Sequence, residues 1–375
     1  MKLTIERTPL LKSLGHVQNV VERRTTIPIL SNVRLEAQGD ELLLTATDMD
    51  VTLVSREAAD ISEGGTTTVA AHTLYEIVRR LAEGAVVELE QQNGTSDLQI
   101  RSGRSSFVLP ALAADEFPAM SEEDLGVSFE LTAATLRKLF DKTRFAMSSE
   151  ETRYYLNGVH LHATRSEGAA ACLRAVATDG HRLARVETPL PEGAKGIPPV
   201  IVPKKTVGEV RRLLDALDQD ASVGIALSPS RIRFQIGTTV LVSRLIDGVF
   251  PDYERVIPQA NEKIALIDSR AFAVAIDRVA TVATDKIRAV KLGFSEGRVV
   301  ASAVSAEAGR AHDEVDCDLS GSEIEIGFNA RYVLDITQQI EGDTIRLEMA
   351  NPASPTLIRD PEDLATIYVL MPMRV

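Results

Sequence analysis

The sequence predicts an α+β fold built from three similar units, at residues 1–125, 126–254 and 255–375. Three repeated features predict it: each unit opens with an alternating strand and a helix, a second amphipathic helix follows, and alternating strands separated by turn signals come after that helix. Because strands follow one another without regular strand–helix–strand alternation, antiparallel sheets are favoured over a doubly wound parallel sheet.

The first strand and helix of each unit share one spacing. The last apolar residue of the strand lies five positions before the first apolar residue of the helix, in the pairs Ile5 and Leu10, Leu131 and Leu136, and Ile267 and Phe272. Each break also holds residues suited to the start of a helix, because their side chains cap free N–H groups or their backbone fits the first turn: Thr8 and Pro9, Thr132, and Asp268 and Ser269.

The second helix of each unit is predicted from apolar residues spaced three and four apart, at 73–81, 205–217 and 330–340. Alternating strands are predicted after each of these helices, at 86–90 and 98–101, 223–227 and 232–236, and 344–348 and 356–359. Two units also end alike, with Phe117-Pro118 and Phe250-Pro251 spaced 133 residues apart. This ordered set of features indicates a threefold internal repeat.

The composition excludes several classes of protein. The chain has 375 residues and two cysteines far apart in sequence, which excludes a disulfide scaffold and suits a reducing cytoplasm. No apolar run reaches 18 residues, and charged residues interrupt the N-terminus before a signal peptide could form. Tryptophan is absent and the net charge is −13, which at first argues against a nucleic-acid partner.

No motif predicts a nucleotide cofactor, a metal site or a catalytic triad. The densest polar segment is 177–184, where Asp179 and His181 flank Gly180. A hydrolase could use this pair as acid and base, whereas the structural interpretation is a turn in which Asp179 caps backbone N–H groups. His160 and His162 lie on one face of a predicted strand; we interpret them as a solvated face, because no third metal ligand is nearby.

Charge is distributed unevenly along the chain. The helical windows 8–24, 72–83, 132–146, 203–217, 269–283 and 329–341 together carry a net charge of +7, so the rest of the chain carries −20. Basic residues on helices are often only solvated. If the helices share one face, however, that face attracts phosphates without reading sequence.

Five segments make a family resemblance specific: Arg153–Gly158, Ala177–Ala184, Val200–Lys205, Asp247–Tyr253 and Tyr368–Val375. They resemble the bacterial DNA polymerase III beta subunits, the replicative sliding clamps, and the similarity runs from Met1 to Val375. The resemblance implies three domains of the DNA-clamp fold in each chain and a head-to-tail homodimer that closes into a ring around duplex DNA. It implies no catalytic residue and no cofactor; the ring tethers a polymerase and is opened by a clamp-loader ATPase.

The resemblance also implies three sets of site residues. The DNA-contact candidates are Arg24, Arg153, Tyr154, Tyr155, Lys204 and Lys205. The candidates for a pocket that binds short hydrophobic peptides of the polymerase, the loader and other polymerases and repair proteins are Leu156, Thr178, Gly180, His181, Arg182, Leu183, Pro251, Arg255, Val256, Val369, Leu370, Met371, Pro372, Met373, Arg374 and Val375. At the dimer seam, Phe107 and Leu109 of one chain are expected to meet Thr281 and Val282 of the other.

The leading hypothesis is therefore a non-catalytic processivity clamp in the cytoplasm. Two alternatives from other classes stay open on the sequence: a hydrolase or nucleic-acid enzyme that uses Asp179 and His181, and a monomeric peptide-binding adaptor with no role on DNA.

Overall fold

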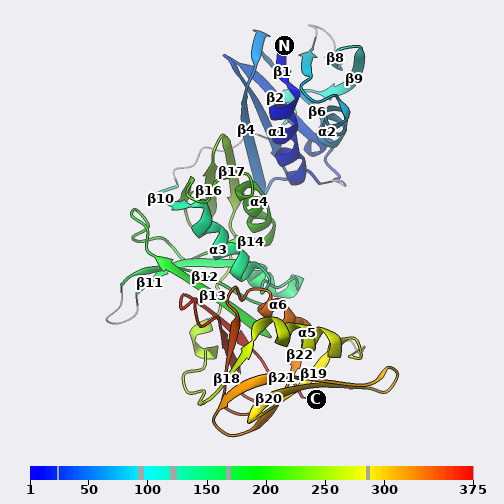
Figure 1. Ribbon diagram of the computed structural model, residues 1–375. Coiled ribbons are helices and arrows are strands. Elements are labelled where there is room, and N and C mark those ends of the chain that lie inside the picture. Colours follow the sequence, from blue (N-terminus) through cyan, green and yellow to red (C-terminus); the bar gives the residue numbers. More distant parts are fainter. Residues whose placement is uncertain (23–24, 92–96, 119–124, 166–169, 284–287, 375) are drawn as a thin grey trace. The chain divides into compact units, whose positions relative to one another are not determined.

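The computed structural model describes the chain except for residues 23–24, 92–96, 119–124, 166–169, 284–287 and 375 (Figure 1). The chain divides into two compact units, one holding Met1–Ala134, Pro191–Pro198 and Lys205–Leu245, the other holding Thr135–Leu190, Pro199–Lys204 and Ile246–Val375. The described α-helices are α1 (Arg7–Val20), α2 (Ala71–Arg80), α3 (Ala133–Arg144), α4 (Lys204–Leu214), α5 (Ser269–Ala280) and α6 (Ala330–Thr337).

The first unit contains one antiparallel sheet in the order β10-β15-β16-β17-β4-β3-β2-β6-β9-β8-β7-β1-β5. Its helix α1 packs on α2 and on strands β3 and β4. The strands are β1 (Lys2–Glu6), β2 (Asn32–Gln38), β3 (Glu41–Thr47), β4 (Val51–Ala58), β5 (Asp60–Glu63), β6 (Gly65–Ala70), β7 (Val86–Glu90), β8 (Asp97–Ser102), β9 (Ser105–Leu112), β10 (Val127–Thr132), β15 (Ser222–Leu227), β16 (Arg231–Ile236) and β17 (Thr239–Arg244).

The second unit contains the antiparallel sheet β14-β11-β12-β13-β25-β24-β23-β18-β21-β20-β19-β22. Its helix α5 packs on α6 and on β20 and β21. The strands are β11 (Gly158–Thr164), β12 (Cys172–Thr178), β13 (Arg182–Pro189), β14 (Val200–Pro203), β18 (Lys263–Asp268), β19 (Ala289–Ser295), β20 (Gly297–Ser305), β21 (Gly309–Ser320), β22 (Ile324–Asn329), β23 (Thr344–Met349), β24 (Thr356–Arg359) and β25 (Thr366–Leu370).

The predicted repeat is present in the element order. Strands β1, β10 and β18 lead directly into α1, α3 and α5, and α2, α4 and α6 are the second helices. The middle repeat contributes strands to both sheets: β17 pairs with β4, and β13 pairs with β25. The α+β class with antiparallel sheets is therefore confirmed, while the unit boundaries at 125/126 and 254/255 stay predictions.

The predicted helix starts differ in their chemistry. Asp268 caps α5, because its Oδ1 accepts the N–H of Ala271 at 2.7 Å. At α1 the predicted Thr8 cap is wrong: Glu6 is the N-cap and makes no side-chain cap bond, and Thr8 already lies inside the helix. Pro9 lies in the first turn, as predicted. Among the described residues, no helix is both long and apolar enough to cross a membrane.

Candidate partner pocket and DNA-contact segment

The turn between β12 and β13 is built by its own side chains. Oδ1 of Asp179 accepts the N–H groups of His181 and Arg182 at 2.9 and 3.0 Å, and Thr178 donates its hydroxyl to the Arg182 carbonyl at 2.7 Å. Gly180 has φ +89°, a left-handed conformation that favours glycine. Asp179 is therefore a turn cap, as the structural interpretation predicted.

Arg182 lies beneath this turn and is 8% exposed. Its guanidinium forms an ion pair with Asp335 of α6, donates to the Phe145 carbonyl at 2.7 Å and contacts Asp179 Oδ2 at 3.1 Å. The same group lies 4.4 Å from the centre of the Tyr332 ring. Arg182 thus holds the turn against α6 and against Phe145, which follows α3, with its donors engaged inside the protein.

A cavity of about 200 Å³ opens beside His181. Four predicted pocket residues line it, namely His181, Met371, Pro372 and Met373, together with Asn329 and Tyr332. The C-terminal segment is fixed there because Met371 N–H donates to the His181 carbonyl and Met373 N–H donates to the Gly327 carbonyl, both at 2.9 Å. Sequence reasoning missed Asn329 and Tyr332. The only local signal of Asn329 was helix capping, since its Oδ1 accepts the N–H of Arg331, and Tyr332 lies inside α6 with no such signal.

An apolar cluster next to this turn contains two further pocket candidates, Leu183 and Val369, at 2% and 1% exposed. It also contains Val176, Tyr253, Ile257, Leu357 and Ile367, and Phe250 packs against it.

The other pocket candidates differ in exposure. Leu156 and Leu370 are buried, Thr178 is half-buried, and the exposed ones are Gly180, Pro251, Arg255, Val256 and Arg374. Val375 lies outside the described residues. A buried apolar floor, with two exposed arginines among the exposed candidates, is an arrangement suited to short peptides with large apolar side chains.

The exposed segment 250–256 is anchored to the sheet by an aromatic and ionic network. The Tyr253 hydroxyl lies 3.0 Å from Nε2 of His162 and accepts from Nη1 of Arg174 at 3.1 Å. The ring of His160 stacks between those of His162 and Phe250, with both centroid distances 4.6 Å. Burial, assisted by the neighbouring His162, lowers the pKa of His160 to about 4. In the described part of the chain no three His, Cys, Asp or Glu residues are grouped to hold a metal ion.

The described DNA-contact candidates lie on two elements, η3 (Glu151–Leu156) and α4. Tyr154 is 52% exposed, and its ring meets that of Tyr155 edge-on at 5.8 Å. Lys204 Nζ donates to Ser149 Oγ at 2.7 Å, and Lys205 Nζ forms an ion pair with Asp48. Arg24 lies outside the described residues. Because both ammonium groups already have partners within the protein, they attract a phosphate less strongly than free lysines would.

The segregation of charge is sharper in the structure than in the sequence windows. The six described α-helices carry 15 of the 41 basic residues and only 5 of the 54 acidic residues. Several of these charges are matched by acids, as in the ion pairs of Lys138 with Asp363 and of Arg79 with Glu76. The helices therefore offer a weakly attractive surface for phosphates rather than a tight one.

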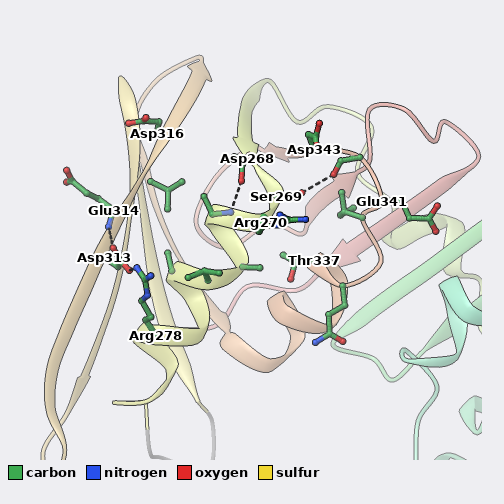
Figure 2. Close-up of a pocket in the computed structure, with 18 residues that line it drawn as sticks. Asp268, Ser269, Arg270, Arg278, Asp313, Glu314, Asp316, Thr337, Glu341 and Asp343 are labelled. Carbon is green, nitrogen blue, oxygen red and sulfur yellow. Dashed lines mark hydrogen bonds and ion pairs between the residues drawn. The ribbon is translucent and has the colours of Figure 1, made fainter.

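Several strand edges are open among the described residues, and two of them lie on β9 and β21. Residues 105–110 of β9 pair only with β8, and residues 309–316 of β21 pair only with β20. The seam candidates Phe107 and Leu109 are half-buried on β9, and Thr281 is exposed at the end of α5, followed by half-buried Val282. A groove of about 820 Å³ lies between α5, β21 and residues 340–343, and six of its eighteen lining residues are acidic. Figure 2 shows these residues.

Three family models match consecutive parts of the chain. They describe the N-terminal, central and C-terminal domains of the DNA polymerase III beta subunit, and they match residues 1–121, 130–252 and 254–374. The three matched domains define a clamp-type protein with a threefold repeat.

Whole-chain relatives agree. The chain is 53% identical to a beta sliding clamp of Caulobacter vibrioides and 38% identical to that of Escherichia coli K12, with all of both chains covered in each case. A crystal structure of the Caulobacter crescentus beta sliding clamp matches all of this chain and 99% of its own with a TM-score of 0.96 and 52% identity. A sliding clamp from Bartonella birtlesii bound to griselimycin, 42% identical and covered fully in both chains, gives a TM-score of 0.97.

The chain therefore belongs to the family of bacterial beta sliding clamps, the DNA polymerase III beta subunits. These are non-catalytic processivity factors of the polymerase, as the resemblance implied. Asp179 and His181 accordingly have structural and pocket positions and no catalytic role.

Proposed function

We propose that two copies of this chain close head to tail into a ring around duplex DNA and tether the replicative polymerase to it in the cytoplasm. The observation that carries this proposal is the segregation of charge, with basic α-helices in a chain whose net charge is −13. A weakly attractive helical surface permits sliding, because each tightly neutralised phosphate adds affinity through counterion release. Retention then comes from topology.

Ring closure is supported by the open edges of β9 and β21. The groove beside β21 is lined by six acidic residues, Asp268, Asp313, Glu314, Asp316, Glu341 and Asp343, against Arg270 and Arg278. The segment 101–112 that contains β9 carries Arg101 and Arg104 and no acid. Complementary charge and two unpaired edges favour extension of one sheet by the other, with Phe107 and Leu109 of one copy against Thr281 and Val282 of its partner.

The pocket at His181, Met371 and Met373 is proposed to receive short hydrophobic peptides of several partners in turn. The polymerase catalytic subunit, the clamp-loader ATPase, and other polymerases and repair proteins are the proposed owners of those peptides. Methionine side chains adapt to different apolar groups, which suits one site shared by many ligands.

Loading onto circular DNA tests the function. We expect the protein, loaded by a clamp-loading ATPase onto a nicked plasmid, to stay with the DNA through gel filtration and to be released when the plasmid is linearised. Equal retention on circular and linear DNA would contradict topological tethering. Sedimentation as a 41 kDa monomer at micromolar concentration, with no ring visible by electron microscopy, would favour the peptide-binding adaptor instead.

A further inference from the structure

The segment 148–157 carries both kinds of candidate site residue. Arg153, Tyr154 and Tyr155 are DNA-contact candidates, and Leu156, next along the chain, is a pocket candidate that is 4% exposed. The segment is closed on itself, because Ser148 N–H donates to the Leu156 carbonyl at 3.0 Å and the Asn157 amide donates to the Glu150 carbonyl at 3.1 Å. A displacement of one end of this segment is therefore transmitted to the other.

Arg153 touches the turn at the mouth of the pocket. Its guanidinium makes a two-point ion pair with Glu150, at 2.8 Å from Nε and 2.5 Å from Nη2. The remaining nitrogen, Nη1, lies so close to Gly180 that a Cβ on Gly180 would stand 2.7 Å from it. The arginine thus rests on the turn that presents His181 to the cavity.

The same segment contacts the other exposed part of the pocket region. A Cβ on Gly248 would stand 3.0 Å from Cβ of Tyr155 and 3.5 Å from the Tyr154 ring. Gly248 leads through Phe250 into Pro251, a pocket candidate. Residues 148–157 therefore contact the chain on two sides of the proposed peptide site.

A phosphate can compete for this arginine. The side chains of Arg153 and Glu150 are 34% and 54% exposed, so their ion pair is open to solvent and weak. A guanidinium binds a phosphate by the same two-point geometry that it uses here with the carboxylate. DNA at Arg153 would replace Glu150 and draw the guanidinium off Gly180.

We propose that Arg153 couples the DNA contact to the peptide pocket, an inference that rests on the proposed function. Without DNA, Glu150 holds the guanidinium over Gly180 and narrows the approach to His181. With DNA, a phosphate takes the guanidinium and uncovers the turn, so the ring on DNA binds partner peptides more tightly than the free ring. The coupling is reciprocal, so a bound peptide strengthens the DNA contact by the same factor.

Fluorescence anisotropy tests the coupling. The probe is a fluorescein-labelled octapeptide with a leucine and a phenylalanine two residues apart, and a peptide with both replaced by serine is the blank. The Kd of the probe is measured for the free protein and for the protein loaded on nicked circular DNA after removal of the loader. We expect the unaltered protein to bind about fivefold more tightly on DNA, the lower end of typical couplings. Arg153→Ala should bind equally in both states.

Arg212→Ala is the matched control, because Arg212 is an exposed helix arginine whose carboxylate partner, Glu209, is on its own helix. It should keep the fivefold ratio. Glu150→Ala releases Arg153 without DNA and should move the affinity of the free protein toward the DNA-bound value. If the unaltered protein stays on the circle and binds the probe equally in both states, the coupling is wrong and the clamp function stands. Loss of retention on the circle would instead overturn the proposed function.

Discussion

The Tyr253 hydroxyl accepts a hydrogen bond from Nη1 of Arg174 at 3.1 Å, and the Arg174 side chain is only 6% exposed. Arg174 also pairs with Glu187 of the next strand and with Glu254. Tyr253 lies between Pro251 and Arg255, so its hydroxyl is one of the contacts that hold the pocket-side segment to the sheet.

We predict that Tyr253→Phe lowers the thermal midpoint of unfolding and weakens binding of a hydrophobic peptide. The variant leaves one buried donor of Arg174 unpaired, which costs about 1–3 kcal/mol. Calorimetry and peptide anisotropy measure the two effects. Tyr154→Phe is the control, since Tyr154 is 52% exposed, and its thermal midpoint should be unchanged. A Tyr253→Phe protein with an unaltered midpoint and full peptide affinity would show that the hydroxyl does not anchor the segment.

A variant of Arg182 distinguishes a structural role of this residue from a role in peptide binding. Because its donors face Asp179, Asp335 and the Phe145 carbonyl, we predict that Arg182→Lys destabilises the second unit by about 1–3 kcal/mol, the loss expected when a buried acceptor is left without its donor. Lysine keeps the charge but lacks the planar fork of donors. A variant with normal thermal unfolding and reduced peptide affinity would assign Arg182 to the peptide instead.

More of the fold than of the candidate site could be predicted from the sequence. The junctions at Ile5, Leu131 and Ile267 follow from local periodicity, which each strand and helix carries within its own residues. The division of the middle repeat between two sheets could not be predicted, because the pairings of β17 with β4 and of β13 with β25 join residues far apart in sequence. Asn329 and Tyr332 were missed for the same reason: only the folded chain brings α6 to His181.

The stack of His160 on Phe250 predicts a pH dependence of stability. The folded pKa of His160 is about 4, below its ordinary value of 6.5, so the unfolded chain binds more protons between these values. Stability from the neutral ring is therefore complete above pH 6.5 and is lost as the pH falls toward 4. The groups facing the ring are His162, Phe250 and the Val200 carbonyl, and none is a carboxylate that would hold the proton.

We predict that His160→Leu, which keeps an apolar side chain on Phe250, flattens this dependence. The thermal midpoint of the unaltered protein should fall more steeply between pH 7 and 4.5 than that of the variant, while the carboxylates titrate alike in both. Parallel curves for the two proteins would mean that His160 does not charge on unfolding in this range.

We predict that Thr281 limits the strength of the proposed seam. Thr281 follows α5 directly, is exposed, and donates its hydroxyl to the carbonyl of Arg278 at 2.7 Å. Arg278 itself lines the groove of Figure 2. Facing the apolar Phe107 and Leu109 of a partner copy, a threonine buries less apolar surface than an isoleucine would. Each added buried methylene contributes about 0.8 kcal/mol.

We predict that Thr281→Ile lowers the dimer dissociation constant about tenfold, measured by sedimentation over a dilution series. Phe107→Ala should raise it, whereas Val86→Ala, an exposed residue on β7, should leave it unchanged. If Thr281→Ile and Phe107→Ala both leave the dissociation constant unaltered, the two open edges do not meet in the dimer, and ring closure must use another surface.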